Sequence, residues 1–141
     1  MSIPKLILGP ELYWGLVYAA ISAIAARNVP PTEAFSASLE NLWYAVPIIA
    51  IPLSFAVFAV RGPGRWVLLA RTNLACLVGL FFAAARVSSA IDYQDSRNSG
   101  VLAGFVISLG LGIVVLFVTD VIAMTIILLG RRKGALTDVA R

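Results

Sequence analysis

Two charged residues lie inside long apolar runs of the sequence, where a charge is costly. Asp120 stands ten residues before Gly130, and Arg71 stands five residues after Trp66. A charge at the centre of a bilayer costs roughly 2.5–3.5 kcal/mol on insertion scales, so such residues mark either a structural ion pair or a path for protons, ions or headgroups. The depths of the two residues differ by about 7 Å, which a long arginine side chain covers. The sequence therefore predicts an Arg71–Asp120 pair between two helices.

Other polar residues are candidates for the same site. Thr72, Asn73 and Thr119 are close enough in sequence to complete the hydrogen bonds of the pair. For the pair itself, a structural link between helices is favoured over a relay, because one opposite-charge pair neutralises itself and no chain of carboxylates leads away from it. If Arg71 reaches to the interface instead, Asp120 is left alone and the relay interpretation gains weight.

Glu11 is a third candidate, near the start of the first apolar segment. It follows Pro10, and proline is tolerated in the first turn of a helix because its missing N–H has no partner there. A carboxylate in that turn complements the helix dipole. A structural role is therefore the favoured interpretation of Glu11, with a role in a relay as the alternative.

The remaining residues argue against catalysis and cofactors. The chain has no histidine, and its single cysteine, Cys76, lies inside an apolar run. These facts remove histidine-ligated haem, most zinc and copper sites and a disulfide framework. Asp92, Asp95 and Asn98 are too sparse for a calcium loop and are interpreted as a solvated loop. We expect no enzyme activity, no cofactor and no metal site. A membrane enzyme acting on lipid or quinone is the least favoured class.

Composition indicates an integral membrane protein. Hydrophobic residues make up 60% of the 141 residues and charged residues 13%, whereas a soluble domain carries about a quarter charged residues. So few charges cannot cover a surface exposed to water, while helices that face lipid need none. The excess of basic residues, 11 against 7, forms no stripe with interleaved aromatic residues, so nucleic acid is not an expected partner.

Four apolar segments reach the roughly 20 residues that span a bilayer. We expect helices at about 6–27, 40–61, 66–86 and 101–130, which would form an all-α four-helix transmembrane bundle of two antiparallel hairpins. The whole chain, 1–141, would be a single transmembrane domain. Pro47 and Pro52 predict a kink in the second helix. The first segment lacks a small-residue cleavage site and is expected to be retained rather than removed as a signal.

The distribution of lysine and arginine predicts the orientation. Seven basic residues flank one side of the predicted helices, and three flank the other side together with four acidic residues. The basic side is expected to be cytoplasmic, which places both termini there in a multi-pass protein of the cell inner (plasma) membrane. Trp14, Trp43, Tyr44 and Trp66 stand near segment ends, where their rings are expected at headgroup level.

The fourth predicted helix carries a face of small residues. Gly100, Gly104, Ser108 and Gly112 recur at every fourth position. Small residues at this spacing let two helices approach closely, which replaces the hydrophobic driving force that lipid does not supply. Packing within the chain is favoured for this face, with contact to another subunit as the alternative.

Two functional hypotheses follow. The favoured one is a non-catalytic structural or accessory subunit that contributes helix packing and assembly to a larger membrane complex. It rests on soluble parts too short to form a domain, on the missing cofactor ligands and on the small-residue face. The expected partners are the lipid bilayer and other membrane protein subunits. The alternative is a small homo-oligomeric transporter or channel that uses Asp120 and Arg71.

Overall fold

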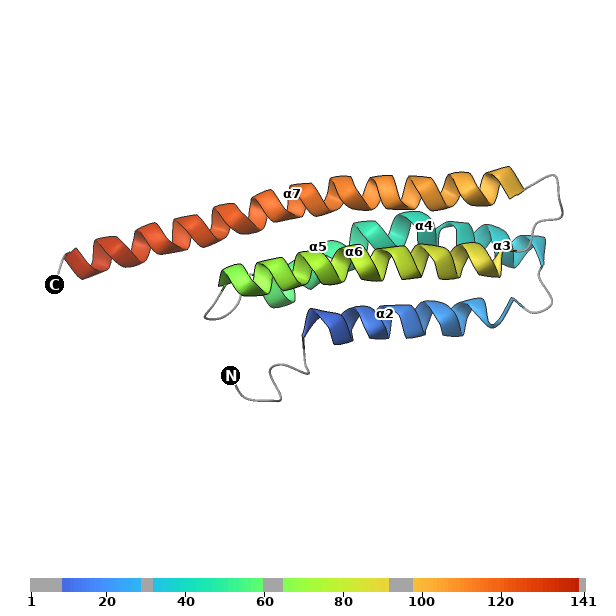
Figure 1. Cartoon of the computed structure of the whole chain (residues 1–141), viewed down its shortest axis with the longest axis horizontal. Helices are drawn as coiled ribbons and strands as arrows, with labels where there is room; N and C mark the ends of the chain where they lie inside the picture. Colours follow the sequence, from blue (N-terminus) through green and yellow to red (C-terminus); the bar gives the residue numbers. More distant parts are fainter. Residues whose placement is uncertain (1–8, 29–31, 60–64, 92–97, 140–141) are drawn as a thin grey trace.

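The computed structural model describes residues 9–28, 32–59, 65–91 and 98–139; for residues 65, 98–99 and 131–139 it describes the backbone alone. Within these ranges the chain is helical and forms no strand (Figure 1). The described part begins with α2 and continues with a broken rod of five short pieces, followed by two long helices. The elements are α2 Pro10–Ala25, α3 Glu33–Glu40, α4 Leu42–Ala45, η1 Val46–Ala50, α5 Ile51–Ser54, η2 Phe55–Ala59, α6 Arg65–Ala90 and α7 Asn98–Val139.

Among the described residues, three helices are long and apolar enough to cross a membrane: Glu33–Ala59, Trp66–Ala90 and Gly100–Gly130. The prediction of an all-helical membrane protein is confirmed at this level. The helix α2 has 16 residues, fewer than the roughly 20 that span the hydrocarbon core. The helices α6 and α7 both extend beyond the predicted ends at residues 86 and 130, to Ala90 and Val139.

The broken rod, which corresponds to the second predicted helix, differs from the prediction at its start. Residues 33–39, which precede the predicted start of this helix at about residue 40, belong to the helix α3, which begins after the extended residue Thr32. Where the sequence predicts a kink, the structure has two π-helical pieces, η1 containing Pro47 and η2 following α5, which contains Pro52. Proline supplies no N–H, so the backbone bonds of a regular helix are interrupted at these positions. At the end of η1 the Tyr13 hydroxyl donates a hydrogen bond to the Ala50 carbonyl at 3.1 Å.

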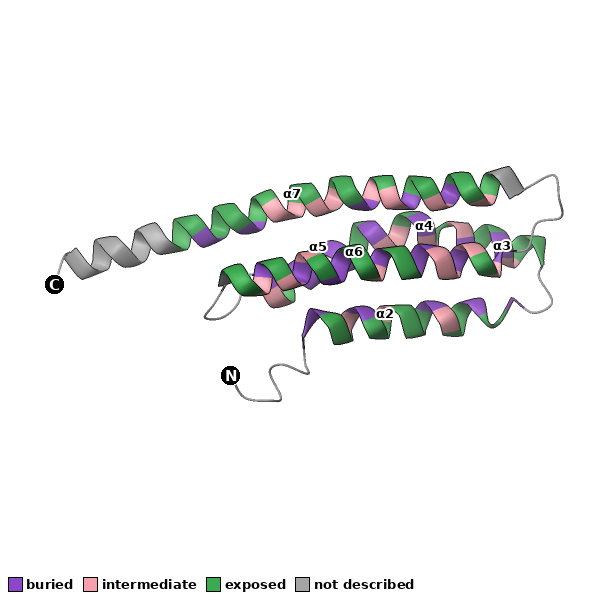
Figure 2. Ribbon diagram, viewed as in Figure 1, coloured by how far each residue is buried: buried purple, intermediate pink, exposed green. Residues whose placement is uncertain are grey.

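The helix α6 occupies the centre of the fold. It lies against α2 on one side and α7 on the other, and α7 also lies along the broken rod (Figure 1). Large buried side chains fill the space between these elements, among them Phe55, Leu80 and Val87. Most of the outer surface of α7 is exposed (Figure 2). In a membrane this surface faces lipid or another protein.

Two indole rings lie between helices, each against a glycine. Trp14 of α2 covers Gly79 of α6, and Trp43 of α4 covers Gly104 of α7, so closely that a Cβ atom at either glycine would overlap the ring. Trp14 is 3% exposed and Trp43 is 4% exposed. Each ring fills a notch that a glycine leaves in the facing helix, and the predicted place of both rings at headgroup level stays a prediction. Tyr44 and Trp66 are exposed, and their place at headgroup level likewise stays a prediction.

Candidate functional site

The polar residues of the apolar region gather around the first half of α6. Arg71 extends from α6 toward the first turn of α2, where it meets the Glu11 carboxylate. Nε donates to Oε1 at 3.0 Å and Nη2 donates to Oε2 at 2.8 Å. A planar guanidinium and a carboxylate in this two-bond geometry form a strong and directional ion pair. The pair joins α6 to α2.

Asn73 joins α6 to α7 on the other side. Its amide Nδ2 donates to Oδ1 of Asp120 at 2.9 Å and to the Leu69 carbonyl of its own helix at 3.1 Å. Asn73 and Asp120 are both partly buried. Among the side chains that the structure describes, Asp120 has no cationic partner. Its carboxylate is therefore held by a neutral amide.

The predicted Arg71–Asp120 pair is wrong in its partners. Consecutive residues of a helix are rotated by about 100°, so Arg71 and Asn73 point in directions about 200° apart. Arg71 faces α2, and Asn73 faces α7. The ion pair that forms uses Glu11, which the sequence interpretation had assigned to the helix dipole. Glu11 does lie in the first turn of α2, directly after Pro10.

The level of Asp120 along α6 follows from its hydrogen bond to Asn73. Asp120 is level with Asn73, which lies only eight residues from the start of α6, while α7 continues for nineteen residues beyond Asp120. The end of the apolar run at Gly130, ten residues beyond Asp120, therefore lies within roughly 3 Å of the level at which α6 begins, and α7 extends past it (Figure 1).

Of the residues expected to complete the hydrogen bonding, Asn73 alone does so. The hydroxyls of Thr72 and Thr119 donate to the carbonyls of Leu68 and Val115, four residues earlier in their own helices, at 2.7 and 2.6 Å. Such bonds satisfy a hydroxyl inside a membrane helix without linking it to a neighbour.

The small-residue face of α7 is buried at three positions and exposed at the fourth. Gly104, Ser108 and Gly112 are buried, with Trp43 against Gly104 and Leu80 of α6 against Gly112. Gly100 is exposed, and a Cβ atom there would meet nothing within 4 Å. Three of the four positions thus pack against side chains of the same chain, and the glycines receive side chains rather than a neighbouring backbone.

A buried amide at the opposite end of the molecule was missed. Asn28, just after α2, is 3% exposed. Its Nδ2 donates to Ser36 Oγ at 3.1 Å and to the Ala90 carbonyl at 3.0 Å, and its Oδ1 accepts from the Thr32 backbone N–H at 3.0 Å. Asn28 therefore fastens the end of α2 to the beginning of α3 and the end of α6. Its place beside a predicted helix end gave no sign of this role.

The acidic group Asp92 and Asp95 lies outside the described residues, and Asn98 is described only in its backbone. Within the described residues, no three metal-ligating side chains of the types His, Cys, Asp and Glu come together. The described polar groups thus offer an ion pair on one side of α6 and an amide-bound carboxylate on the other.

No protein-family model, curated protein or solved structure matches this chain. The geometry of the polar groups therefore carries the functional interpretation.

Proposed function

We propose that the chain crosses the inner (plasma) membrane four times, with both termini in the cytoplasm. The three long apolar helices and the position of α2 along α6 support this arrangement. Leu6, Ile7 and Leu8 precede α2 in the sequence and supply apolar residues on its N-terminal side. The seven-to-three distribution of basic residues supports the orientation.

We further propose that the protein is a non-catalytic accessory subunit of a larger membrane complex. The observation that carries this proposal is the Asp120 carboxylate, which lies in the most apolar of the three candidate membrane spans without a cationic partner among the described side chains. An uncompensated charge at membrane depth costs roughly 2.5–3.5 kcal/mol. A lysine or arginine on a transmembrane helix of another subunit would offset that cost and fix the position of this helix against α7.

The surface around Asp120 suits such a contact. Phe117 is 70% exposed, and Ile113, Val121 and Met124 are also exposed on α7. Lipid covers apolar side chains as well as protein does, so exposure alone does not favour a partner. The carboxylate among these side chains does, because lipid tails offer it no compensation.

A homo-oligomeric transporter or channel is the second candidate, and the same carboxylate favours it. An isolated membrane carboxylate can exchange a proton or bind a cation. Arg71, however, is held by Glu11 on the opposite side of α6. An ion or proton path between α6 and α7 would therefore use Asp120 without Arg71. This weakens the version of the transporter that uses both residues.

The substitution Asp120→Asn tests the two candidates. Asparagine has a carbonyl oxygen that can keep the hydrogen bond from Asn73, so the fold should be retained. The control is Thr125→Val, since the Thr125 hydroxyl bonds to the Val121 carbonyl of its own helix at 2.8 Å. Each variant is purified from its native membrane in mild detergent, and the mass and composition of the complex are measured.

An accessory subunit should form a hetero-complex of fixed stoichiometry that Asp120→Asn dissociates and Thr125→Val preserves. The partner helix should contain a basic residue whose replacement has the same effect as Asp120→Asn. A monodisperse homo-oligomer that survives Asp120→Asn would overturn the subunit proposal. Loss of ion or proton flux in that intact oligomer after reconstitution would favour the transporter.

A further inference from the structure

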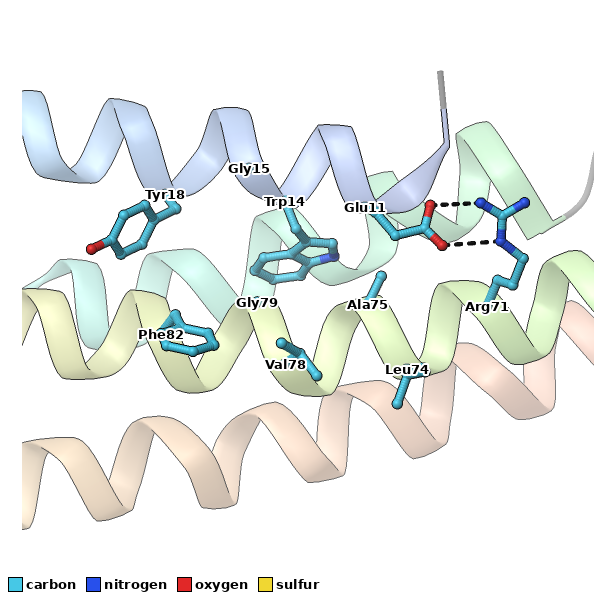
Figure 3. A pocket seen from close by; sticks show the side chains of 10 residues that line it. All are labelled: Glu11, Trp14, Gly15, Tyr18, Arg71, Leu74, Ala75, Val78, Gly79 and Phe82. Atoms are coloured by element: carbon cyan, nitrogen blue, oxygen red, sulfur yellow. Dashed lines mark hydrogen bonds and ion pairs between the residues drawn. The ribbon is translucent and has the colours of Figure 1, made fainter. Parts of the chain in front are cut away.

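An open groove runs between α2 and α6, on the side of α6 that bears the ion pair. Its volume is about 500 Å³, within the range of roughly 300–1,000 Å³ that is usual for small-molecule sites. Gly15, Ala75 and Gly79 are part of its lining, and a Cβ atom at Gly15 would meet nothing within 4 Å. Leu74, Val78, Phe82 and Tyr18 supply its apolar walls (Figure 3).

The Glu11–Arg71 pair closes one end of this groove (Figure 3). The Glu11 side chain is 54% exposed and the Arg71 side chain 25% exposed, so both are accessible from the groove. Arginine has five N–H donors and a carboxylate has about four acceptor sites. The pair occupies two of each, and Nη1 of Arg71 makes no hydrogen bond to any described residue. A positive and a negative group with unused bonding capacity therefore stand side by side.

The length of the groove matches one leaflet of a membrane. Eleven residues separate Arg71 from Phe82, which corresponds to about 16 Å along a helix. Half of a hydrocarbon core of about 30 Å is about 15 Å. The ion pair lies near the start of α6, so the apolar part of the groove extends from that end of the helix toward its middle. A third helix, about 10 Å wide or more with its side chains, is too thick for a groove between two helices already in contact through Trp14 and Gly79.

We propose that this groove holds one acyl chain of a zwitterionic phospholipid whose headgroup carries a primary ammonium. The lipid phosphate binds the unused Arg71 donors, and the ammonium binds the Glu11 carboxylate. A purely anionic headgroup meets the Glu11 charge without compensation, and a quaternary ammonium has no N–H to donate to it. This site is independent of the proposed subunit role, because Asp120 lies on the other side of α6.

The experiment measures lipid bound to the intact protein in detergent by native mass spectrometry. The probes are phosphatidylethanolamine, phosphatidylcholine and phosphatidylglycerol with identical acyl chains. We expect phosphatidylethanolamine to bind about tenfold more tightly than either of the others. Equal binding of all three lipids would overturn the proposed headgroup recognition.

The substitution Gly15→Leu tests the groove itself. A Cβ atom at Gly15 meets nothing within 4 Å, so the leucine fills the groove without disturbing α2 and α6. Gly110→Leu is the matched control, because Gly110 is also an exposed helical glycine with open space around it, on α7 and outside the groove. We expect Gly15→Leu to weaken phosphatidylethanolamine binding at least tenfold and Gly110→Leu to leave it unchanged. Unchanged binding in Gly15→Leu, or an equal loss in both variants, would refute the site.

Glu11→Gln separates headgroup recognition from simple occupancy of the groove. This variant should still bind lipid but lose the preference for phosphatidylethanolamine over phosphatidylglycerol. If the preference persists, Glu11 does not bind the ammonium and the proposed headgroup contact is wrong.

Discussion

Arg71 and Asn73 stand two positions apart on α6, yet they bind side chains on opposite neighbouring helices. Arg71 binds Glu11 of α2 through two hydrogen bonds, and Asn73 binds Asp120 of α7 through one. The central helix α6 thereby joins α2 and α7 at nearly the same level along its axis. The two links differ in charge, since the first is a neutralised ion pair and the second leaves a carboxylate with a neutral partner.

The ion pair should contribute measurably to stability. Glu11→Gln leaves the Arg71 guanidinium without a counter-charge, and we expect the free energy of unfolding to fall by about 1–2 kcal/mol, the size of polar links between membrane helices in model peptides. Arg71→Gln should have a similar effect. Unfolding with an anionic detergent, followed by circular dichroism, measures both.

The double variant Glu11→Gln with Arg71→Gln provides the control for this coupling. Its destabilisation should be clearly smaller than the sum of the two single effects, because neither charge is then left alone. Strictly additive effects would mean that the two side chains do not stabilise each other.

The glycines of α7 should differ according to their surroundings. Gly104→Ala places a methyl group on the Trp43 ring, and we expect a loss of about 1–3 kcal/mol in thermal or detergent unfolding. Gly100→Ala, at an open position of the same face, should be neutral or slightly stabilising. Combining Gly104→Ala with Trp43→Phe should restore part of the loss. Equal effects at Gly100 and Gly104 would contradict the notch packing.

Asn28 should be far more important to stability than its position beside a loop implies. Asn28→Ala removes three hydrogen bonds and leaves buried partners unsatisfied, so we expect a destabilisation of about 1–3 kcal/mol. Asn41→Ala is the comparison, because Asn41 is exposed and bonds only weakly, at 3.5 Å, to its own helix. That variant should stay within about 0.5 kcal/mol of the wild type. Similar melting temperatures for the two variants would argue against the role given to Asn28.

The proposed topology predicts that the loop around Ser96 is accessible from outside an intact cell and that the C-terminus is not. A membrane-impermeant maleimide should label Ser96→Cys but not a cysteine added after Arg141. The native Cys76 is buried and should remain unlabelled in both. Permeabilising the membrane should make the C-terminal cysteine reactive. Labelling of that cysteine in intact cells would reverse the predicted orientation.

Much of the architecture could be predicted from the sequence because it depends on local composition. Long apolar runs predict membrane helices whatever the rest of the fold is. Two prolines within one run predict that its helix is interrupted. The residues that form the polar links between helices could also be predicted, because Arg71, Asn73, Asp120 and Glu11 are polar residues in apolar segments. The notches at Gly79 and Gly104 gave a weaker signal, because the tryptophans that fill them lie far away in sequence.

The sequence by itself determined which side chains must find partners within the apolar region, because a charge or amide there is costly in any arrangement. Only the tertiary structure decided which side chains these partners are. The choice of partner depends on which face of α6 meets α2 and which meets α7, and on where α7 lies along the axis of α6. Both are set by the fit of large side chains into glycine notches on neighbouring helices. That fit separates Arg71 from Asp120 and leaves the carboxylate on which the proposed function rests.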